Sequence, residues 1–173
     1  VKNIRNSFVI SNDLYKFAVM KKKMVFIMNP ISGTTNKAGI PELIAKTLDA
    51  NTFDYEICLT EHAGHAFEIA TEAKDNGVDV VVAVGGDGTV NEVARAIVHS
   101  NTALGIIPCG SGNGLARHLM IPMQLKKAIE VINEYQIHDL DYGIINEHPF
   151  FCTCGMGFDA FVSMKFAEAG KRG

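Results

Sequence analysis

The sequence predicts an α/β fold in which a parallel sheet carries helices on both faces. Apolar runs of strand length alternate at least four times with helical segments before Pro122, which is typical of a parallel sheet with right-handed crossovers. The run over residues 80–84 is unbroken and mostly valine, as expected for a strand covered on both faces. The residues after it repeat at the spacing of one helix face: Val90, Val93, Ala94, Ile97 and Val98.

The other elements follow from the same patterns along the chain. Residues 1–23 are mixed in polarity and weakly periodic, so we interpret them as an N-terminal extension. Strands are predicted over 24–28, 55–59 and 103–107, and again over 137–140 and 149–153. Helices are predicted over 41–48, where Pro41 suits a first helical position, and over 63–76, which Asn76 and Gly77 end. Two more are predicted, a short one over 115–119 and one over about 125–132.

Composition limits the class of protein. With 173 residues and 47% hydrophobic residues, the chain is long enough for one globular domain. A net charge of −3 gives no electrostatic footprint for nucleic acid. No apolar stretch is long enough to span a bilayer. The first segment does not resemble a signal peptide, because Asn12, Asp13 and Lys16 interrupt its apolar residues. A cytoplasmic location is therefore expected.

Cysteines and histidines give no metal signature. The four cysteines form no CxxC pair, so free thiols are expected at Cys58, Cys109, Cys152 and Cys154. Cys152 and Cys154 would lie on the same side of one strand, which favours packing in the core. His62 and His65 are three apart at a predicted helix start. Without a nearby acidic or cysteine partner they are interpreted as surface histidines.

A glycine-flanked acid lies where the strand over 80–84 becomes a helix, in Gly85, Gly86, Asp87, Gly88, Thr89, Val90, Asn91 and Glu92. Glycines permit close approach to the backbone, and a helix start offers unpaired amides to an anion. Because Asp87 would repel phosphate without a cation, the turn predicts a Mg²⁺-nucleotide site or a proton acceptor. The alternative is structural: Thr89 and Glu92 fit a capping box, and the glycines serve the turn alone.

A second loop of the same kind favours the functional interpretation. Residues 108–114 follow the strand over 103–107 and read Pro-Cys-Gly-Ser-Gly-Asn-Gly. Ligands of parallel α/β sheets bind beyond the carboxyl ends of the strands. Four segments are expected at that edge: the turn of Asn29, Pro30, Ile31, Ser32 and Gly33; Thr60; the Asp87 turn; and the Ser111 loop.

These motifs together resemble the diacylglycerol kinase catalytic-domain family, which includes bacterial lipid kinases and sphingosine- and ceramide-kinase-like enzymes. The resemblance covers residue 24 to the end, with the motifs in the family's order, and neither a Walker loop nor a Rossmann G-x-G-x-x-G is present. It implies an NAD kinase/phosphofructokinase-like N-terminal domain over 24–140 that binds ATP. Residues 141–173 would begin a second, β-rich, lipid-binding domain that is truncated, so the chain alone is expected to be inactive.

The resemblance also implies roles for residues. ATP would contact Asn29, Pro30, Ile31, Ser32, Gly33, Thr60, Gly85, Gly86, Asp87, Gly88, Thr89, Val90, Asn91, Glu92 and Ser111. Asp87 would be the catalytic or Mg²⁺-organising acid, with Asp141 a second candidate for the metal. Asp141 is equally explained as a hinge acid bonded to the backbone. Many bacterial members carry Asp at the position of Gly114, so this loop looks closer to the sphingosine-kinase-like branch.

The implied substrate is a lipid hydroxyl, of diacylglycerol or a sphingoid-type lipid. Peripheral membrane contact would come through the missing domain, and a homo-oligomer is compatible with the sequence. Two alternatives stay open. One is an NAD kinase, in which the same glycine turn occurs, and the other is an inactive nucleotide-binding or regulatory protein.

Overall fold

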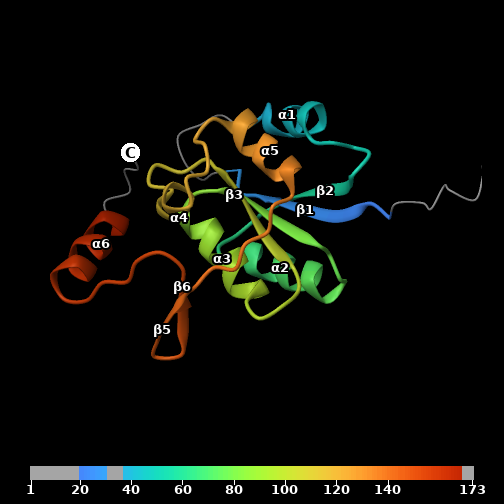
Figure 1. Ribbon diagram of the computed structural model, residues 1–173. Coiled ribbons are helices and arrows are strands. Elements are labelled where there is room, and N and C mark those ends of the chain that lie inside the picture. Colours follow the sequence, from blue (N-terminus) through green and yellow to red (C-terminus); the bar gives the residue numbers. More distant parts are fainter. Residues whose placement is uncertain (1–19, 31–36, 169–173) are drawn as a thin grey trace, which may run out of the picture.

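The computed structural model describes residues 20–30 and 37–168. Its main body is a four-stranded parallel sheet with helices on both faces, which confirms the predicted fold class (Figure 1). The strand order is β2-β1-β3-β4. The sheet consists of β1 (Lys22–Met28), β2 (Phe53–Leu59), β3 (Val80–Gly85) and β4 (Ala103–Pro108). The expected N-terminal extension falls mostly on residues 1–19, outside the described residues.

Each face of the sheet has its own apolar core. One layer of helices contains α2 (His65–Asp75), α3 (Asp87–Ile97) and α4 (Gly114–His118), which pack on Val25, Ile27, Val81 and Ala83. The opposite layer contains α1 (Ile40–Thr47) and α5 (Leu125–Glu134). Every residue of β3 is buried, because this strand is central and covered on both sides. Figure 1 shows the two layers above and below the strands.

The helix starts differ from the predicted ones for local reasons. Helix α2 begins at His65 rather than at residue 63, because Gly64 has a φ of +85°, which is not a right-handed helical conformation. Helix α3 begins at Asp87, before the apolar periodicity starts at Val90. The glycines of this turn are therefore divided between the end of a strand and the first turn of a helix.

The strand predicted over 137–140 is wrong. Residues 136–142 have no regular secondary structure, since they form no ladder with either sheet, and residues 137–140 are exposed. The strand predicted over 149–153 is only partly correct. A two-stranded antiparallel hairpin forms from β5 (Gly143–Ile145) and β6 (His148–Phe150), and its turn uses positive φ at Asn146 and Glu147.

The end of β6 overturns the expectation for two cysteines. Cys152 and Cys154 lie beyond the strand and are exposed, so they do not pack in a core. All four cysteines are free thiols, as expected. The final helix, α6 (Phe158–Glu168), was not predicted, because its apolar residues are spread around the helix and give no single face. Within the ranges 20–30 and 37–168, no helix combines the length and apolar character needed to cross a bilayer.

The hairpin is tied to the main body through Tyr142. Its hydroxyl lies 2.6 Å from Nε2 of His99, just after α3, and its ring packs against Phe151 with centroids 5.7 Å apart. These contacts place β6 beside α3, as Figure 1 shows. The hairpin thus lies close to the first helix that follows a glycine turn.

An ion pair joins the amino-terminal ends of β1 and β3. Lys22 Nζ donates to Asp79 Oδ1 at 2.9 Å, and the Lys23 amide donates to Asp79 Oδ2 at 2.8 Å. Partial burial acts to raise the pKa of Asp79, but these two hydrogen bonds and the lysine charges outweigh it and lower the pKa. The Asp79 carboxylate therefore stabilises the folded state when it is ionised.

This ion pair predicts a pH dependence of stability. Since the pKa of Asp79 is lower in the folded chain than in the unfolded one, its stabilisation is present above about pH 4. It is lost as the pH falls through the folded-state pKa. In urea titrations at several pH values, Asp79→Asn should reduce the acid-dependent fall in the free energy of unfolding. The control Asp54→Asn, on exposed β2 surface, should keep the wild-type profile. Identical profiles for wild type and Asp79→Asn would show that the pair contributes nothing.

Candidate active site

Four segments meet at the carboxyl edge of the sheet, as the topology predicts. Backbone hydrogen bonds join them beyond the strand ends. The Thr60 amide donates to the Met28 carbonyl at 3.0 Å, and the Asn29 amide donates to the Val84 carbonyl at 3.3 Å. The Cys109 amide donates to the Gly85 carbonyl at 2.8 Å. The residues after β2, β1, β3 and β4 therefore lie side by side in that order.

The two glycine loops touch each other through their backbones. A Cβ built on Gly110 would lie 2.5 Å from Cα of Gly86, and one built on Gly86 would lie 3.1 Å from Cα of Gly110. Contacts this short with backbone atoms exclude any side chain unless a loop moves. Glycine is thus needed at position 110 for the loops to pack, independently of any ligand, whereas a side chain at position 86 would require a shift of a few tenths of an ångström.

The Asp87 carboxylate points into the second glycine loop. Oδ2 accepts a hydrogen bond from the Asn113 amide at 2.9 Å, and Oδ1 accepts one from the Gly114 amide at 2.6 Å. A Cβ on Gly112 would lie 2.7 Å from Oδ2, so that glycine lets the loop wrap around the carboxylate. Because a carboxylate has about four acceptor sites, both oxygens retain lone pairs for a further partner. Such oxygens suit Mg²⁺.

The Asn113 side chain closes this loop on itself. Its Oδ1 accepts a hydrogen bond from the Gly110 amide at 2.8 Å, and its Nδ2 donates to the Gly110 carbonyl at 2.7 Å. Asn113 is buried and has a φ of +54°, a conformation that asparagine tolerates better than most residues. These bonds hold the Asn113 and Gly114 amides in place for Asp87. Asn113 was not among the predicted site residues, although it lies in the motif that carries the resemblance.

A cleft of about 620 Å³ opens beside Asp87. Its volume falls within the range of small-molecule sites. One wall is α3, where Asp87, Asn91 and Arg95 lie one turn apart on the same face. The opposite walls are the second glycine loop and the chain that follows β5. The lining residues beyond α3 are Gly112, Gly114, Leu115, His148, Pro149, Phe150, Phe151, Cys152 and Thr153.

Two basic residues, one in the cleft and one at the carboxyl edge of the sheet, were missed. Arg95 lines the cleft, and its guanidinium lies 5.8 Å from the ring centroid of Phe67. Arg95 follows Asp87 by eight residues, and this spacing could have predicted that the two lie on the same face of the helix. Lys37 is buried, and its Nζ donates to the Asn29 carbonyl. Burial lowers the pKa of Lys37, against an upward effect of Cys109. Nothing in the mixed sequence around Lys37 indicated that it is buried.

Thr89 and Glu92 do not form a capping box. Thr89 lies inside α3, whose N-cap is Gly86, and its side chain is buried against Gly85. Glu92 Oε1 instead accepts a hydrogen bond from the Gly64 amide at 3.2 Å, at the start of α2. The structural alternative from sequence is therefore wrong in its pairing. Glu92 connects the Asp87 helix to the segment that follows Thr60.

Loss of this connection should have a small, measurable effect on stability. Glu92→Ala leaves the Gly64 amide without its acceptor, which is expected to cost about 1 kcal/mol of unfolding free energy. Glu92→Gln keeps a side-chain carbonyl and should remain close to wild type. Denaturant titration of the three proteins tests this. Equal stabilities of Glu92→Ala and Glu92→Gln would contradict a role for the hydrogen bond.

Of the other predicted site residues, some lie at the edge of the sheet or in the cleft and others do not. Thr60 is buried at the edge, Val90 and Asn91 line the cleft, and Ser111 is exposed in the second loop. Ile31, Ser32 and Gly33 lie outside the described residues. Pro30 is exposed in the turn after β1, and Asp141 is exposed ahead of β5, where it is not part of the cleft lining.

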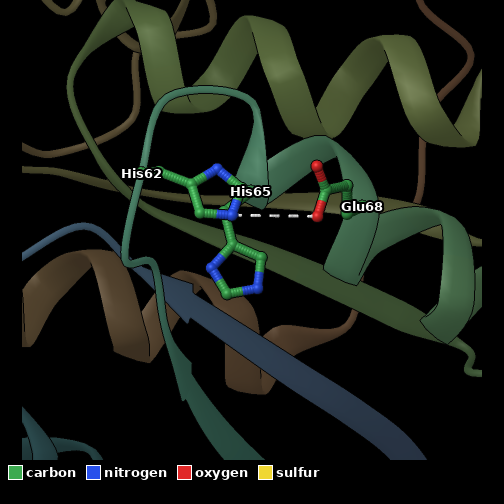
Figure 2. Close-up of side chains that lie close together, drawn as sticks. All are labelled: His62, His65 and Glu68. Carbon is green, nitrogen blue, oxygen red and sulfur yellow. Dashed lines mark ion pairs between the residues drawn. The ribbon is translucent and has the colours of Figure 1, made fainter.

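The histidine pair has an acidic neighbour that sequence reasoning overlooked. Glu68 lies one turn into α2, and its Oε2 is 4.0 Å from His62 Nε2 (Figure 2). His62 is exposed, in agreement with the expected surface position, and His65 is half-buried. The expectation that no acid lies near them is wrong, because a helix brings together residues three apart.

The fold and the cleft define a class of α/β proteins in which glycine loops enclose a carboxylate at the carboxyl edge of a parallel sheet. Comparison with known proteins identifies the family. The sequence model of the diacylglycerol kinase catalytic domain matches residues 23–145, so the chain belongs to the diacylglycerol kinase catalytic-domain family.

Individual relatives agree with this assignment. The chain is 36% identical over 134 residues to a diacylglycerol kinase of Staphylococcus saprophyticus, covering 76% of this chain and 44% of the relative. It is 35% identical to a diacylglycerol kinase of Staphylococcus aureus, covering 42% of that protein. A crystal structure of a diacylglycerol kinase from Bacillus anthracis superposes with a TM-score of 0.67 at 28% identity, over 75% of this chain and 49% of that one. The chain thus spans less than half the length of these relatives.

Proposed function

We propose that this chain forms the nucleotide-binding part of an ATP-dependent lipid kinase, which transfers the γ-phosphate of ATP to a lipid hydroxyl. The observation that carries the proposal is the position of Asp87. Its carboxylate lies in a cleft of about 620 Å³, between the first turn of α3, the second glycine loop and β6. Membership of the diacylglycerol kinase family supports the same activity.

The first turn of α3 supplies the phosphate-binding groups in this proposal. The first amides of a helix have no partner within the helix, and they attract anions. Gly85, Gly86 and Gly88 surround this turn, and Gly88 has open space where a side chain would be. Asn29, Thr60 and Ser111 would contact the rest of the nucleotide, because the residues that follow β1, β2 and β4 lie along the same edge of the sheet.

Asp87 has two tasks in this proposal. Its carboxylate would hold Mg²⁺, directly or through water, and the ion would neutralise charge on the phosphates. A carboxylate oxygen that does not ligate the ion would accept the proton of the lipid hydroxyl. Since the transition state of phosphoryl transfer is loose, the proton moves late, and an ordinary carboxylate is a sufficient base. The Asn113 and Gly114 amides fix the carboxylate in one orientation, so less reorganisation is needed during transfer.

The lipid would be held by the residues after Leu140. We infer that residues 24–140 are the ATP-binding domain and that residues 141–173 belong to the lipid-binding domain. Large apolar side chains in this part are exposed, which favours contact with further apolar groups. They include Ile144, Ile145, Met156, Phe158 and Phe161. Asp141, at this boundary, stays a candidate second acid for Mg²⁺.

A phosphoryl-transfer assay on the complete gene product tests the function. Radiolabelled ATP with Mg²⁺ is offered diacylglycerol, a sphingoid base or NAD, and label is expected in a lipid. Mg·ATP at 100 times its dissociation constant should also add about 2.7 kcal/mol of stability. Label appearing in NAD would show an NAD kinase instead. The absence of both transfer and thermal stabilisation would show that the protein does not use ATP.

A further inference from the structure

We infer that His62, His65 and Glu68 form a binding site for a divalent transition-metal ion of the zinc class, separate from the Asp87 cleft. One nitrogen of each histidine and one oxygen of Glu68 lie within 4.8 Å of one another. The three side chains come from the turn after Thr60 and from the first turn of α2, and Figure 2 shows His62 facing Glu68 with the His65 ring beside that of His62. This inference does not depend on the proposed kinase activity.

The His62 ring is already oriented for ligation. Its Nδ1 lies 3.0 Å from the Ala63 carbonyl, which can only accept, so Nδ1 carries the proton. The lone pair of Nε2 is then directed towards Glu68 Oε2, 4.0 Å away. A backbone carbonyl that holds the other ring nitrogen is the usual support for a metal-bound histidine. In a tetrahedral zinc site a nitrogen and an oxygen ligand lie about 3.4 Å apart, so the two exposed side chains need to approach each other by about 0.6 Å to hold an ion.

His65 completes the set. Its ring now stacks on that of His62, with centroids 4.6 Å apart and an interplanar angle of 10°. Because imidazole lone pairs lie in the ring plane, the His65 ring must rotate out of this stack to bind the same ion. His65 Nδ1 accepts a hydrogen bond from the Glu61 amide at 3.0 Å, so the proton of the neutral ring is on Nε2. When either nitrogen of this ring ligates an ion, Nδ1 no longer accepts from the Glu61 amide, which then donates to water. That exchange is feasible because Glu61 is exposed.

The donor set points to a particular class of ion. Two imidazole nitrogens and one carboxylate suit Zn²⁺ and its neighbours, whereas Mg²⁺ and Ca²⁺ prefer oxygen ligands throughout. Three protein ligands leave a fourth position for water. The Glu68 charge also offsets the repulsion between a cation and the positive end of α2. The site is thus chemically distinct from the oxygen-rich surroundings of Asp87.

Calorimetric titration of the metal-free protein with Zn²⁺ tests the site. One ion is expected to bind, with a dissociation constant on the order of 10 μM. His62→Ala and Glu68→Gln should each weaken binding by about 10-fold or more. Both positions are exposed, so the variants should fold, which circular dichroism checks. The matched control His138→Ala removes an exposed imidazole elsewhere and should bind as wild type does.

The exposed thiols of Cys152 and Cys154 require a separate readout. Titration with Co²⁺ should give visible bands of nitrogen and oxygen ligation without the near-ultraviolet charge-transfer band of a thiolate. Zn²⁺ should also raise the Tm of wild type but not of His62→Ala. Three results would overturn the inference: no binding, wild-type affinity in both His62→Ala and Glu68→Gln, or a spectrum dominated by thiolate.

Discussion

Replacing Asp87 with asparagine should lower kcat for phosphoryl transfer by at least about 100-fold in the complete gene product. The asparagine side chain has no charge for Mg²⁺ and cannot accept the proton of the substrate hydroxyl. It also presents an NH₂ group to one of the two amides that the carboxylate now binds, those of Asn113 and Gly114. Part of the effect will therefore be structural.

Stability and binding measurements separate these contributions. Because Asp87 is exposed, loss of one of its two hydrogen bonds should cost only about 0.5–1.5 kcal/mol of unfolding free energy. The matched control Asp75→Asn removes an exposed carboxylate at the end of α2 and should leave kcat unchanged. If Asp87 acts in the reaction, kcat falls far more than the affinity for ATP measured without metal. A kcat within a factor of about two of wild type would exclude Asp87 from the chemistry.

Replacing Gly110 with alanine should destabilise the protein and weaken Mg·ATP binding together. The new Cβ would lie 2.5 Å from Cα of Gly86 and 2.9 Å from Oδ1 of Asn113, so both glycine loops must move. Forcing such atoms into a packed region typically costs about 1–3 kcal/mol. For a chain of this size the Tm should fall by about 2–12 °C.

Gly39→Ala is the matched control for this substitution. Gly39 precedes α1, has a φ of −89°, and has no heavy atom within 4 Å of a built Cβ. Its replacement should leave the Tm and the affinity for Mg·ATP close to wild type. Calorimetry gives both quantities for each variant. Wild-type behaviour of Gly110→Ala would show that the contact between the two loops is not required.

Much of the fold could be predicted because the signals are local. The continuous apolar run of β3, mostly valine, and the helical spacing after Val90 specify a buried central strand and the helix that packs on it. Alternation of such units specifies a parallel sheet, and the topology then brings the strand ends to one edge. The hairpin was harder to predict, since its Asn146-Glu147 turn lacks the glycine that usually marks two-residue turns.

The site could be predicted only in part, because its hydrogen bonds join distant residues. Asp87 and Asn113 are 26 positions apart, and Glu92 and Gly64 are 28 apart. Sequence spacing assigned Glu92 to a local cap, whereas the fold places the Gly64 amide within its reach. Burial of Lys37 likewise depends on its position against the end of β1, where its Nζ donates to the Asn29 carbonyl. Such contacts follow from the tertiary structure.

The central claim is that the Asp87 carboxylate faces Mg²⁺ and the phosphates of ATP at the carboxyl edge of the sheet. A crystal structure of the complete gene product with Mg²⁺ and a non-hydrolysable ATP analogue tests it most directly. We expect the phosphates at the first turn of α3, with Mg²⁺ bound directly or through water to Asp87. A nucleotide bound elsewhere, or an Asp87 carboxylate with no contact to the metal or its waters, would contradict the account.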